Sequence, residues 1–271
     1  MPAESPRVFG EDYWRNFLTN GDTLERRLRI VFKHLPSEPR CHLCAAPFTG
    51  PGGAAMRLIG KSRALQNPNT CNQCFEFIST HHGGAEIEAS MLFADIRGST
   101  TIAEGLSPTE FRALLDRFYT VALRVVFAHN GSFDKFVGDE LVALFFPLIT
   151  GSNHAEQAVK AARALLVAVG HDDPAGPWVP LGAGVHTGRT WFGAVGEGGG
   201  SQLTAVGDAM NTTARLASTA RAGEILVTTA AAAAAGLDPA LERRSLDLKG
   251  KALPTEVVSI RVGPVAAETA A

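Results

Sequence analysis

The pattern of hydrophobic and polar residues changes near residue 89. Beyond that point, short apolar runs of strand length alternate with longer segments whose apolar residues recur at helical spacing. The pattern predicts strands at 91–94, 132–137, 140–146, 181–186, 189–195, 224–227, 241–248 and 255–262, and helices at 107–129, 153–169 and 208–220. This order, β-α-β-β-α-β with later strands added, predicts an α+β fold in which one sheet carries helices on one face.

The first part of the chain has a different character. Apolar residues at 11–35 have mostly helical spacing, with a break at 20–22, and predict two short helices. Glycine- and proline-containing turns are expected at 50–53 and 67–69, among four cysteines. We therefore expect three regions. They are a helical segment at 1–38, a zinc-ribbon-like four-cysteine module at 39–84 that ends in a linker at 81–84, and a large domain at 85–265.

Composition narrows the class of protein. The chain has 271 residues, 45% hydrophobic and 19% charged, with a net charge of −2. A packed core is expected, and the absence of a basic stripe argues against a nucleic-acid binder. The longest apolar stretches are too short to span a membrane, and the first residues lack the pattern of a signal peptide. The sequence therefore predicts a cytoplasmic protein.

The four cysteines form two pairs, Cys41 with Cys44 and Cys71 with Cys74, each separated by two residues. This knuckle spacing is typical of a tetrahedral thiolate site, and a cytoplasmic chain favours a metal over disulfides. The sequence favours structural zinc. An iron–sulfur cluster with a sensing role remains open, as do free or redox-switched cysteines. The module could also bind a regulatory partner or support dimerisation.

Two aspartates mark the candidate chemistry of the large domain. Asp95 ends a short apolar strand, and Asp139 lies at the reversal between two apolar strands of a predicted hairpin. Carboxylates at neighbouring strand ends can share hard cations, because Mg²⁺ binds carboxylate oxygens together with substrate phosphates. Taken alone, an aspartate such as Asp95 is more often a helix cap.

Five motifs extend this pattern in a fixed order. They are FADIRGST (93–100), FDKFVGDE (133–140), VHTGR (185–189), TAVGDAMNTTARL (204–216) and LKGK (248–251). Together they resemble the catalytic domain of the class III nucleotidyl cyclases, over roughly residues 89–262. The resemblance implies a ferredoxin-like cyclase core and a head-to-tail homodimer with two active sites, each built from both chains.

The resemblance also implies a ligand set for two Mg²⁺ or Mn²⁺ ions in each site. Asp95, Asp139 and the backbone carbonyl of Ile96 would hold them. One ion would lower the pKa of the ribose 3′-hydroxyl, which attacks the α-phosphorus of ATP. The other would neutralise the leaving pyrophosphate.

Further roles follow from the same resemblance. Asn211 would orient the ribose and Arg215 would stabilise charge on the α-phosphate; their spacing of four places both on one helix face. Lys249 would bind the terminal phosphates. Arg189 matches a position that contacts phosphate in some members, although an ordinary turn arginine is a nearly equal alternative.

Base recognition is expected to rest on Lys135 and Thr204. A lysine can donate a hydrogen bond to adenine N1 but would meet a proton on guanine N1, so Lys135 favours ATP over GTP. Threonine in place of the more familiar aspartate resembles a bacterial adenylyl cyclase subgroup, some of whose members respond to bicarbonate. The expected activity is therefore an adenylate cyclase that makes 3′,5′-cyclic AMP and pyrophosphate.

The sequence favours two other functions less. A catalytically silent, cyclase-shaped regulator that signals through the cysteine module is disfavoured because every expected catalytic position is present. A diguanylate cyclase would need a Gly-Gly-acidic-acidic-Phe turn, and the chain has VGDEL at 137–141 instead.

Overall fold

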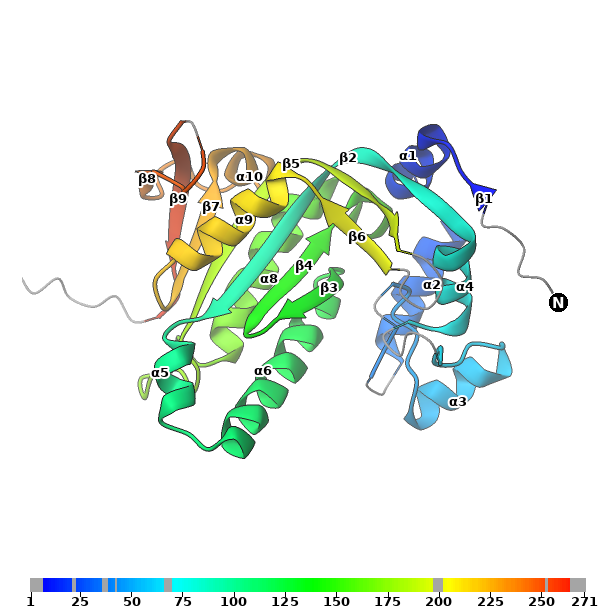
Figure 1. Cartoon of the computed structure of the whole chain (residues 1–271), viewed down its shortest axis with the longest axis horizontal. Helices are drawn as coiled ribbons and strands as arrows, with labels where there is room; N and C mark the ends of the chain where they lie inside the picture. Colours follow the sequence, from blue (N-terminus) through cyan, green and yellow to red (C-terminus); the bar gives the residue numbers. More distant parts are fainter. Residues whose placement is uncertain are drawn as a thin grey trace, which may run out of the picture.

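The centre of the molecule is one nine-stranded sheet (Figure 1). The computed structural model describes residues 7–20, 23–35, 39–41, 43–65, 70–196, 202–251 and 253–263. The strands run in the order β3-β4-β2-β5-β7-β9-β8, while β1 pairs with β2 and β6 pairs with β5. Their bounds are β1 (Arg7–Val8), β2 (His81–Ile96), β3 (Ser132–Val137), β4 (Glu140–Phe145), β5 (Leu181–Val195), β6 (Gln202–Val206), β7 (Glu224–Thr228), β8 (Arg243–Leu246) and β9 (Thr255–Arg261). The pairs β1–β2 and β5–β7 are parallel and the others antiparallel.

The helices that the pattern predicted in the large domain are present. The helices are α1 (Glu11–Asn20), α2 (Thr23–His34), α3 (Gly50–Leu58), α4 (Asn72–Thr80), α5 (Ser99–Glu104), α6 (Pro108–Ala128), α7 (Pro147–Thr150), α8 (His154–Ala168), α9 (Asp208–Thr219) and α10 (Thr229–Ala234), with a 3₁₀ turn at Gly151–Asn153. α6 begins with a capping box: the Ser107 hydroxyl accepts from the N–H of Glu110, and the Glu110 carboxylate accepts from the N–H of Ser107.

Helices cover both faces of the sheet, not one face as expected. Leu92 and Ala94 of β2 lie in the core that the sheet forms with α6 and α8. Met91 and Phe93 point to the other face, where they pack in a second core with residues of α1 and α9. A strand buried on both faces has a continuous apolar run, so the pattern does not show which faces are covered.

Two central strands are much longer than predicted. β2 begins at His81, so the linker expected at 81–84 is instead strand, and β5 is continuous through the break expected at 187–188. The glycines there allow close approach of two backbones: a Cβ on Gly84 would lie 2.6 Å from the Phe192 carbonyl oxygen, and one on Gly193 would lie 2.3 Å from that of Gly83. Because glycine is also typical of turns, the sequence pattern wrongly predicted a linker at 81–84 and a break at 187–188.

The elements that were not predicted include β6 and α3. β6 carries Thr204 and pairs with the last part of β5. α3 begins at Gly50, where a glycine- and proline-rich turn was expected; Pro51 occupies its first turn, where proline is tolerated. The turn expected at 67–69, and residues 21–22 of the expected helix break, lie outside the described residues.

The N-terminal elements divide between two cores. Trp14 and Leu18 of α1 are fully buried in the core on the α9 side of the sheet. α2, α3 and the cysteine loops instead share a small core that includes Phe32, Met56 and Cys71. None of the helices in the described ranges is long and apolar enough to cross a membrane.

Candidate active site

Acidic residues lie at the neighbouring ends of β2 and β4. Asp95, the second-last residue of β2, is in register with Glu140, the first residue of β4. Asp139 occupies the turn between β3 and β4 beside Gly138. The φ of Gly138 is +61°, in the left-handed region that favours glycine. The Tyr119 hydroxyl of α6 donates to the Gly138 carbonyl and so helps to hold this turn.

A cluster of charges surrounds these aspartates. Arg97 forms an ion pair with Asp95, and it donates a 2.7 Å hydrogen bond to the carbonyl oxygen of Ser218 in α9. Burial raises the pKa of Glu140 to about 7; the charge of Asp139 adds to the rise and Arg97 opposes it. Acidic side chains are therefore crowded at a half-buried edge of the sheet, where ionisation of Glu140 is disfavoured.

This edge has the donor set of a hard-cation site. Oδ2 of Asp139 is buried, and no hydrogen-bond partner for it is found among the described residues. A buried carboxylate oxygen is costly unless a proton donor or a cation compensates it. The carbonyl of Ile96 belongs to the last residue of the same strand as Asp95. The chemistry of Asp95, Asp139 and the Ile96 carbonyl is therefore compatible with the Mg²⁺ or Mn²⁺ ligand set that the resemblance implies.

A second polar cluster joins β3 to β6. The Lys135 ammonium lies 3.4 Å from the Thr204 hydroxyl oxygen, although the two residues are 69 positions apart. The same hydroxyl donates a 3.0 Å hydrogen bond to Oδ2 of Asp134, which lies 3.3 Å from the Lys135 ammonium. The Asp134 side chain is 1% exposed, and burial raises its pKa while Lys135 and Thr204 oppose the rise.

The Asp134 contact sets the direction of the Thr204 hydroxyl. Because its proton is donated to the carboxylate, the hydroxyl oxygen presents lone pairs on its other side. The cluster therefore offers a donor, Lys135, beside an acceptor, Thr204. Adenine presents the complementary pair, an N1 acceptor beside an N6 donor, whereas guanine presents the reverse pair.

Asn211 and Arg215 belong to α9. The turn that contains Lys249 lies near Arg215. Asn211 is exposed and Arg215 half-buried, one helical turn apart. A Cβ on Gly250 would lie 3.2 Å from the Arg215 guanidinium, so the turn at exposed Lys249 packs against that side chain. An ion pair between Lys251 and Asp208 also fastens this turn to the start of α9.

Arg189 is not brought together with these residues. Along β5, Gly184 packs against α9, whereas Val185 belongs to the core on the α8 side. Strict alternation places Arg189 on the α8 side, away from Asn211 and Arg215. There it forms a 2.9 Å ion pair with Glu86, and both side chains are largely exposed.

Sequence reasoning did not single out three charged residues of these clusters. They are Arg97, Asp134 and Glu140. Each lies within one or two residues of a predicted position, in the motifs at 93–100 and 133–140. The adjacent charged residues Asp139 and Glu140 at a strand end are a signal that could have identified Glu140. Asp134 has no such local signal, because its contact with Thr204 depends on the distant strand β6.

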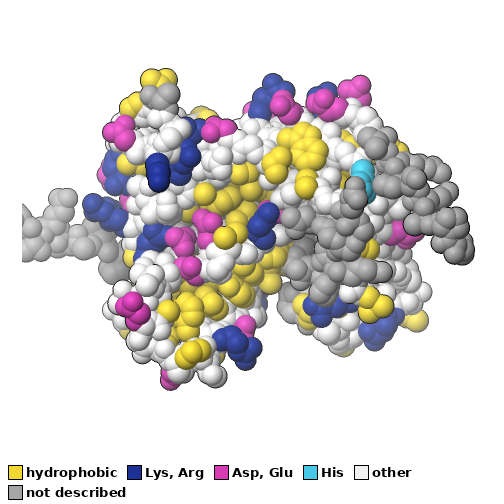
Figure 2. All heavy atoms as spheres, in the orientation of Figure 1, with side chains coloured by type: hydrophobic (Ala, Val, Ile, Leu, Met, Phe, Trp, Pro, Cys, Tyr) yellow, Lys and Arg dark blue, Asp and Glu magenta, His cyan; other side chains and the backbone are white. Residues whose placement is uncertain are grey.

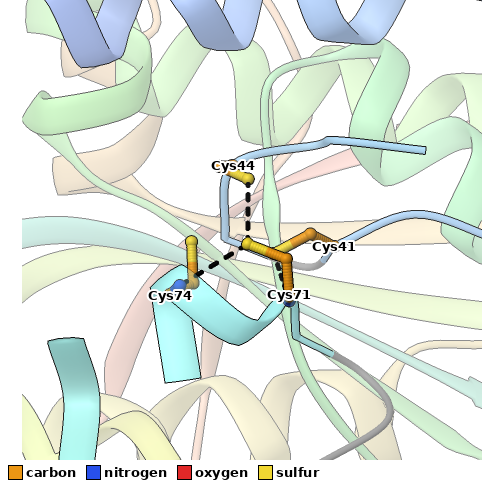
Figure 3. Close-up of side chains that lie close together, drawn as sticks. All are labelled: Cys41, Cys44, Cys71 and Cys74. Carbon is orange, nitrogen blue, oxygen red and sulfur yellow. Dashed lines mark hydrogen bonds between the residues drawn. The ribbon is translucent and has the colours of Figure 1, made fainter. Parts of the chain in front are cut away.

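The four cysteines converge at a separate site in the N-terminal module (Figure 3). Cys41 and Cys44 come from one loop, and Cys71 and Cys74 from the start of α4; their four Sγ atoms lie within 4.8 Å of one another. Among the residues that the structure describes, these thiols are free of disulfides. The arrangement is that of a candidate metal site.

Comparison with known proteins identifies the class. Residues 85–258 match the family model of the adenylate and guanylate cyclase catalytic domain, and the chain belongs to this family. Its members form cyclic nucleotides, typically dimerise and use Mg²⁺ or Mn²⁺ in catalysis.

The chain is similar to curated bacterial proteins over its cyclase region. It is 36% identical over 146 residues to adenylate cyclase 1 of Rhizobium meliloti, covering 51% of this chain and 22% of that protein. It is 32% identical over 139 residues to an uncharacterized protein of Mycobacterium tuberculosis, covering 51% of this chain and 25% of that protein. The chain thus spans about a quarter of the length of these relatives.

Solved structures of both specificities share the fold. The guanylyl cyclase Cya2 matches with a TM-score of 0.60 and 26% identity, covering 65% of this chain and 93% of that one. The adenylyl cyclase CyaB from P. aeruginosa matches with a TM-score of 0.57 and 24% identity, covering 65% and 95%. The fold therefore does not decide between ATP and GTP.

Proposed function

We propose that this chain is an adenylate cyclase that converts ATP to 3′,5′-cyclic AMP and pyrophosphate. The observation that carries the choice of ATP is the cluster of Asp134, Lys135 and Thr204. Its donor and acceptor are ordered for adenine N1 and N6, because Asp134 takes up the proton of the Thr204 hydroxyl. Guanine would bring a donor against the lysine and an acceptor against the threonine oxygen.

The residues divide the chemistry of the proposed reaction. Asp95, Asp139 and the Ile96 carbonyl would hold two Mg²⁺ or Mn²⁺ ions, which when bound activate the ribose 3′-hydroxyl and neutralise the triphosphate. Asn211 would orient the ribose. Arg215 would stabilise the charge that develops on the α-phosphate as the 3′-oxygen forms its new bond to phosphorus.

The bond that breaks joins the α-phosphorus to the pyrophosphate oxygen. Lys249, exposed on a turn that packs against Arg215, would bind the departing phosphates. Arg189 is a weaker phosphate contact in this proposal, because it faces the α8 side of the sheet and is paired with Glu86.

We propose a homodimer in which each site uses the aspartates of one chain and the α9 residues of its partner. Exposed valines support an interface at the site's rim: Val137 precedes the Gly138 turn and is 55% exposed, and Val206 precedes α9 and is 46% exposed. Figure 2 shows hydrophobic side chains gathered on the face that carries α9, β2 and β3.

The first test measures cyclic nucleotide made from ATP or GTP with Mg²⁺ or Mn²⁺. The wild-type chain is compared with an Asp95→Ala, Asp139→Ala double variant. Cyclic AMP from ATP that disappears in the double variant supports the proposal. If a folded, metal-loaded dimer makes no cyclic product, the chain is better described as the silent regulator.

A complementation assay tests the shared site. Asp139→Ala and Arg215→Ala are each expected to be nearly inactive, whereas an equal mixture should recover about a quarter of the wild-type rate. This recovery arises because about half of the randomly paired dimers are mixed and each mixed dimer has one intact site. A mixture as inactive as its components would mean that each site lies within one chain.

A further inference from the structure

The four-cysteine site has the dimensions of a site for one metal ion. Four thiolates at about 2.3 Å from a tetrahedral ion lie about 3.8 Å apart. Sγ of Cys44 and Sγ of Cys71 are 3.8 Å apart, and all four sulfurs lie within 4.8 Å of one another (Figure 3). A disulfide needs about 2.05 Å between sulfurs. A cluster of several irons would spread its thiolates further, because they bind different metal ions.

The surroundings of the sulfurs are those of thiolates. The backbone N–H of Cys71 donates to Sγ of Cys41 at 3.3 Å, and that of Cys74 points to Sγ of Cys71 at 3.5 Å. The Lys61 ammonium lies 3.9 Å from Sγ of Cys71. A divalent ion with four thiolates has a formal charge of −2, so nearby donors and cations are the compensation that it requires.

A buried arginine joins this site to the cyclase domain. Arg29 of α2 is 7% exposed, and one of its Nη atoms donates to the carbonyl of Leu43, the residue before Cys44. The other donates a 2.7 Å hydrogen bond to the carbonyl of Gly131, 102 positions away. One guanidinium therefore bridges the cysteine loop and the residue that precedes β3.

The turn at Gly131 is held on several sides. Lys33, one helical turn beyond Arg29, donates a 3.0 Å hydrogen bond to the side-chain oxygen of Asn130. A Cβ on Gly131 would lie 2.7 Å from the side chain of Val126 and 2.8 Å from that of Phe145, so the backbone is packed without free space. Displacement of this turn must therefore move the strand that follows it.

That strand carries the proposed base-reading cluster. Lys135 lies four residues beyond Gly131 on β3, and Asp139 follows the end of the same strand. We propose that the four cysteines bind one zinc ion and that this ion, through Arg29 and Gly131, positions β3 for adenine recognition. Arg29 is then a positioning residue. The coupling to adenine rests on the proposed cyclase function, whereas the zinc site and its link to β3 do not.

The first experiment needs no cyclase activity. Elemental analysis of the full chain is expected to give one zinc per chain. A chelator can reach the ion, because Cys44 and Cys74 line a cavity of about 300 Å³. Removal of zinc should speed amide hydrogen exchange in 130–137 and leave Thr255–Arg261 of β9 unchanged. Iron in place of zinc would overturn the metal assignment, and unchanged exchange at 130–137 after loss of zinc would overturn the coupling.

The second experiment compares Arg29→Lys with Arg15→Lys, an exposed arginine of α1 that pairs with Glu11. A lysine keeps the charge beside the thiolates but cannot bridge both carbonyls. Arg29→Lys should keep its zinc and raise KM for ATP about tenfold with kcat little changed. This pattern indicates an interaction that is lost equally from the bound substrate and the transition state. Arg15→Lys should match the wild-type chain.

The outcomes separate the two proposals. A purely structural role for Arg29 would lower the active fraction, and therefore kcat, at unchanged KM; that result would overturn the positioning role. If the wild-type chain makes no cyclic nucleotide but loss of zinc loosens 130–137, the proposed function fails and the zinc-linked control of β3 stands.

Discussion

The cyclase domain and the four-cysteine module are built in opposite ways. In the cyclase domain, large apolar side chains such as Phe118, Leu141 and Phe145 fill the core, and the charged clusters lie at its rim. In the module, the small core of Phe32 and Met56 includes the cysteines themselves. A short segment that buries little apolar surface needs an additional source of stability. Loss of a charged group at the rim of the cyclase domain should therefore change activity. Loss of a cysteine thiolate from the module should change folding.

The largest effect should follow from Cys71→Ser. Serine can still cap α4, as the Cys71 side chain does, but it is a poor zinc ligand. Binding of structural zinc contributes about 10 kcal/mol or more to the folding of small zinc modules. We expect zinc to be lost and exchange protection to vanish in α4, while α8 stays protected. Hydrogen exchange by mass spectrometry can check this, and a module that stays protected without metal would break the comparison.

The next effect concerns a histidine inside the cyclase domain. His186 accepts or donates a 3.0 Å hydrogen bond with the Thr228 hydroxyl, and its pKa is lowered to about 4 by burial and by nearby Lys251, while Asp208 opposes the shift. Between pH 6.5 and 4 the unfolded chain therefore binds more protons at this position than the native chain. The free energy of unfolding should fall by about 1–3 kcal/mol on this account as pH drops through that window.

His186→Asn should remove this part of the acid sensitivity. Urea unfolding at pH 7 and at pH 5 measures it, with the exposed His34→Asn as the matched control. An equal acid dependence in wild-type and His186→Asn chains would contradict the assignment.

A smaller effect, on activity rather than folding, is expected from Asp134→Asn. The variant keeps the shape, but its amide can donate to Thr204 and so reverse the direction of the hydroxyl hydrogen bond. We expect kcat/KM for ATP to fall about tenfold and the preference over GTP to narrow, because one charged hydrogen bond is lost. Steady-state kinetics with both nucleotides, beside exposed Asp116→Asn, would check this. An unchanged nucleotide preference would remove Asp134 from the base-reading cluster.

The smallest effect should come from Ser107→Ala. It removes the capping box of α6 at an exposed position, which should cost about 1 kcal/mol of unfolding free energy. Ser245→Ala, at an exposed position of β8, should cost less. Denaturant midpoints measure both, and activity should be retained in each.

Local signals explain how much of this fold could be predicted. The β3–β4 hairpin and the start of α6 depend on neighbouring residues, and both agree with the prediction. The lengths of β2 and β5 depend on pairing between residues about 100 positions apart. The sequence pattern did not predict these lengths, because the glycines within both strands are also typical of turns. Helix α3 was missed because Gly50–Leu58 begins with residues typical of turns.

The candidate site divides in the same way. The sequence placed Asp95 and Asp139 at neighbouring strand ends, and the register of β2 with β4 agrees with that placement. The closeness of Lys135 and Thr204 followed only from a resemblance, and their role in reading adenine stays a prediction. The link from Arg29 to Gly131 joins distant residues through a backbone carbonyl, a contact with no side-chain pattern in the sequence.

The long strand β2 also has a consequence for how such chains can evolve. It runs without interruption from His81, directly after the helix that carries Cys74, to Asp95 at the proposed catalytic edge. Successive side chains of a strand face opposite sides, so an insertion or deletion of one residue here would turn every later side chain to the wrong face. Divergence between related chains of this architecture should therefore keep the length of this stretch fixed while its exposed residues vary.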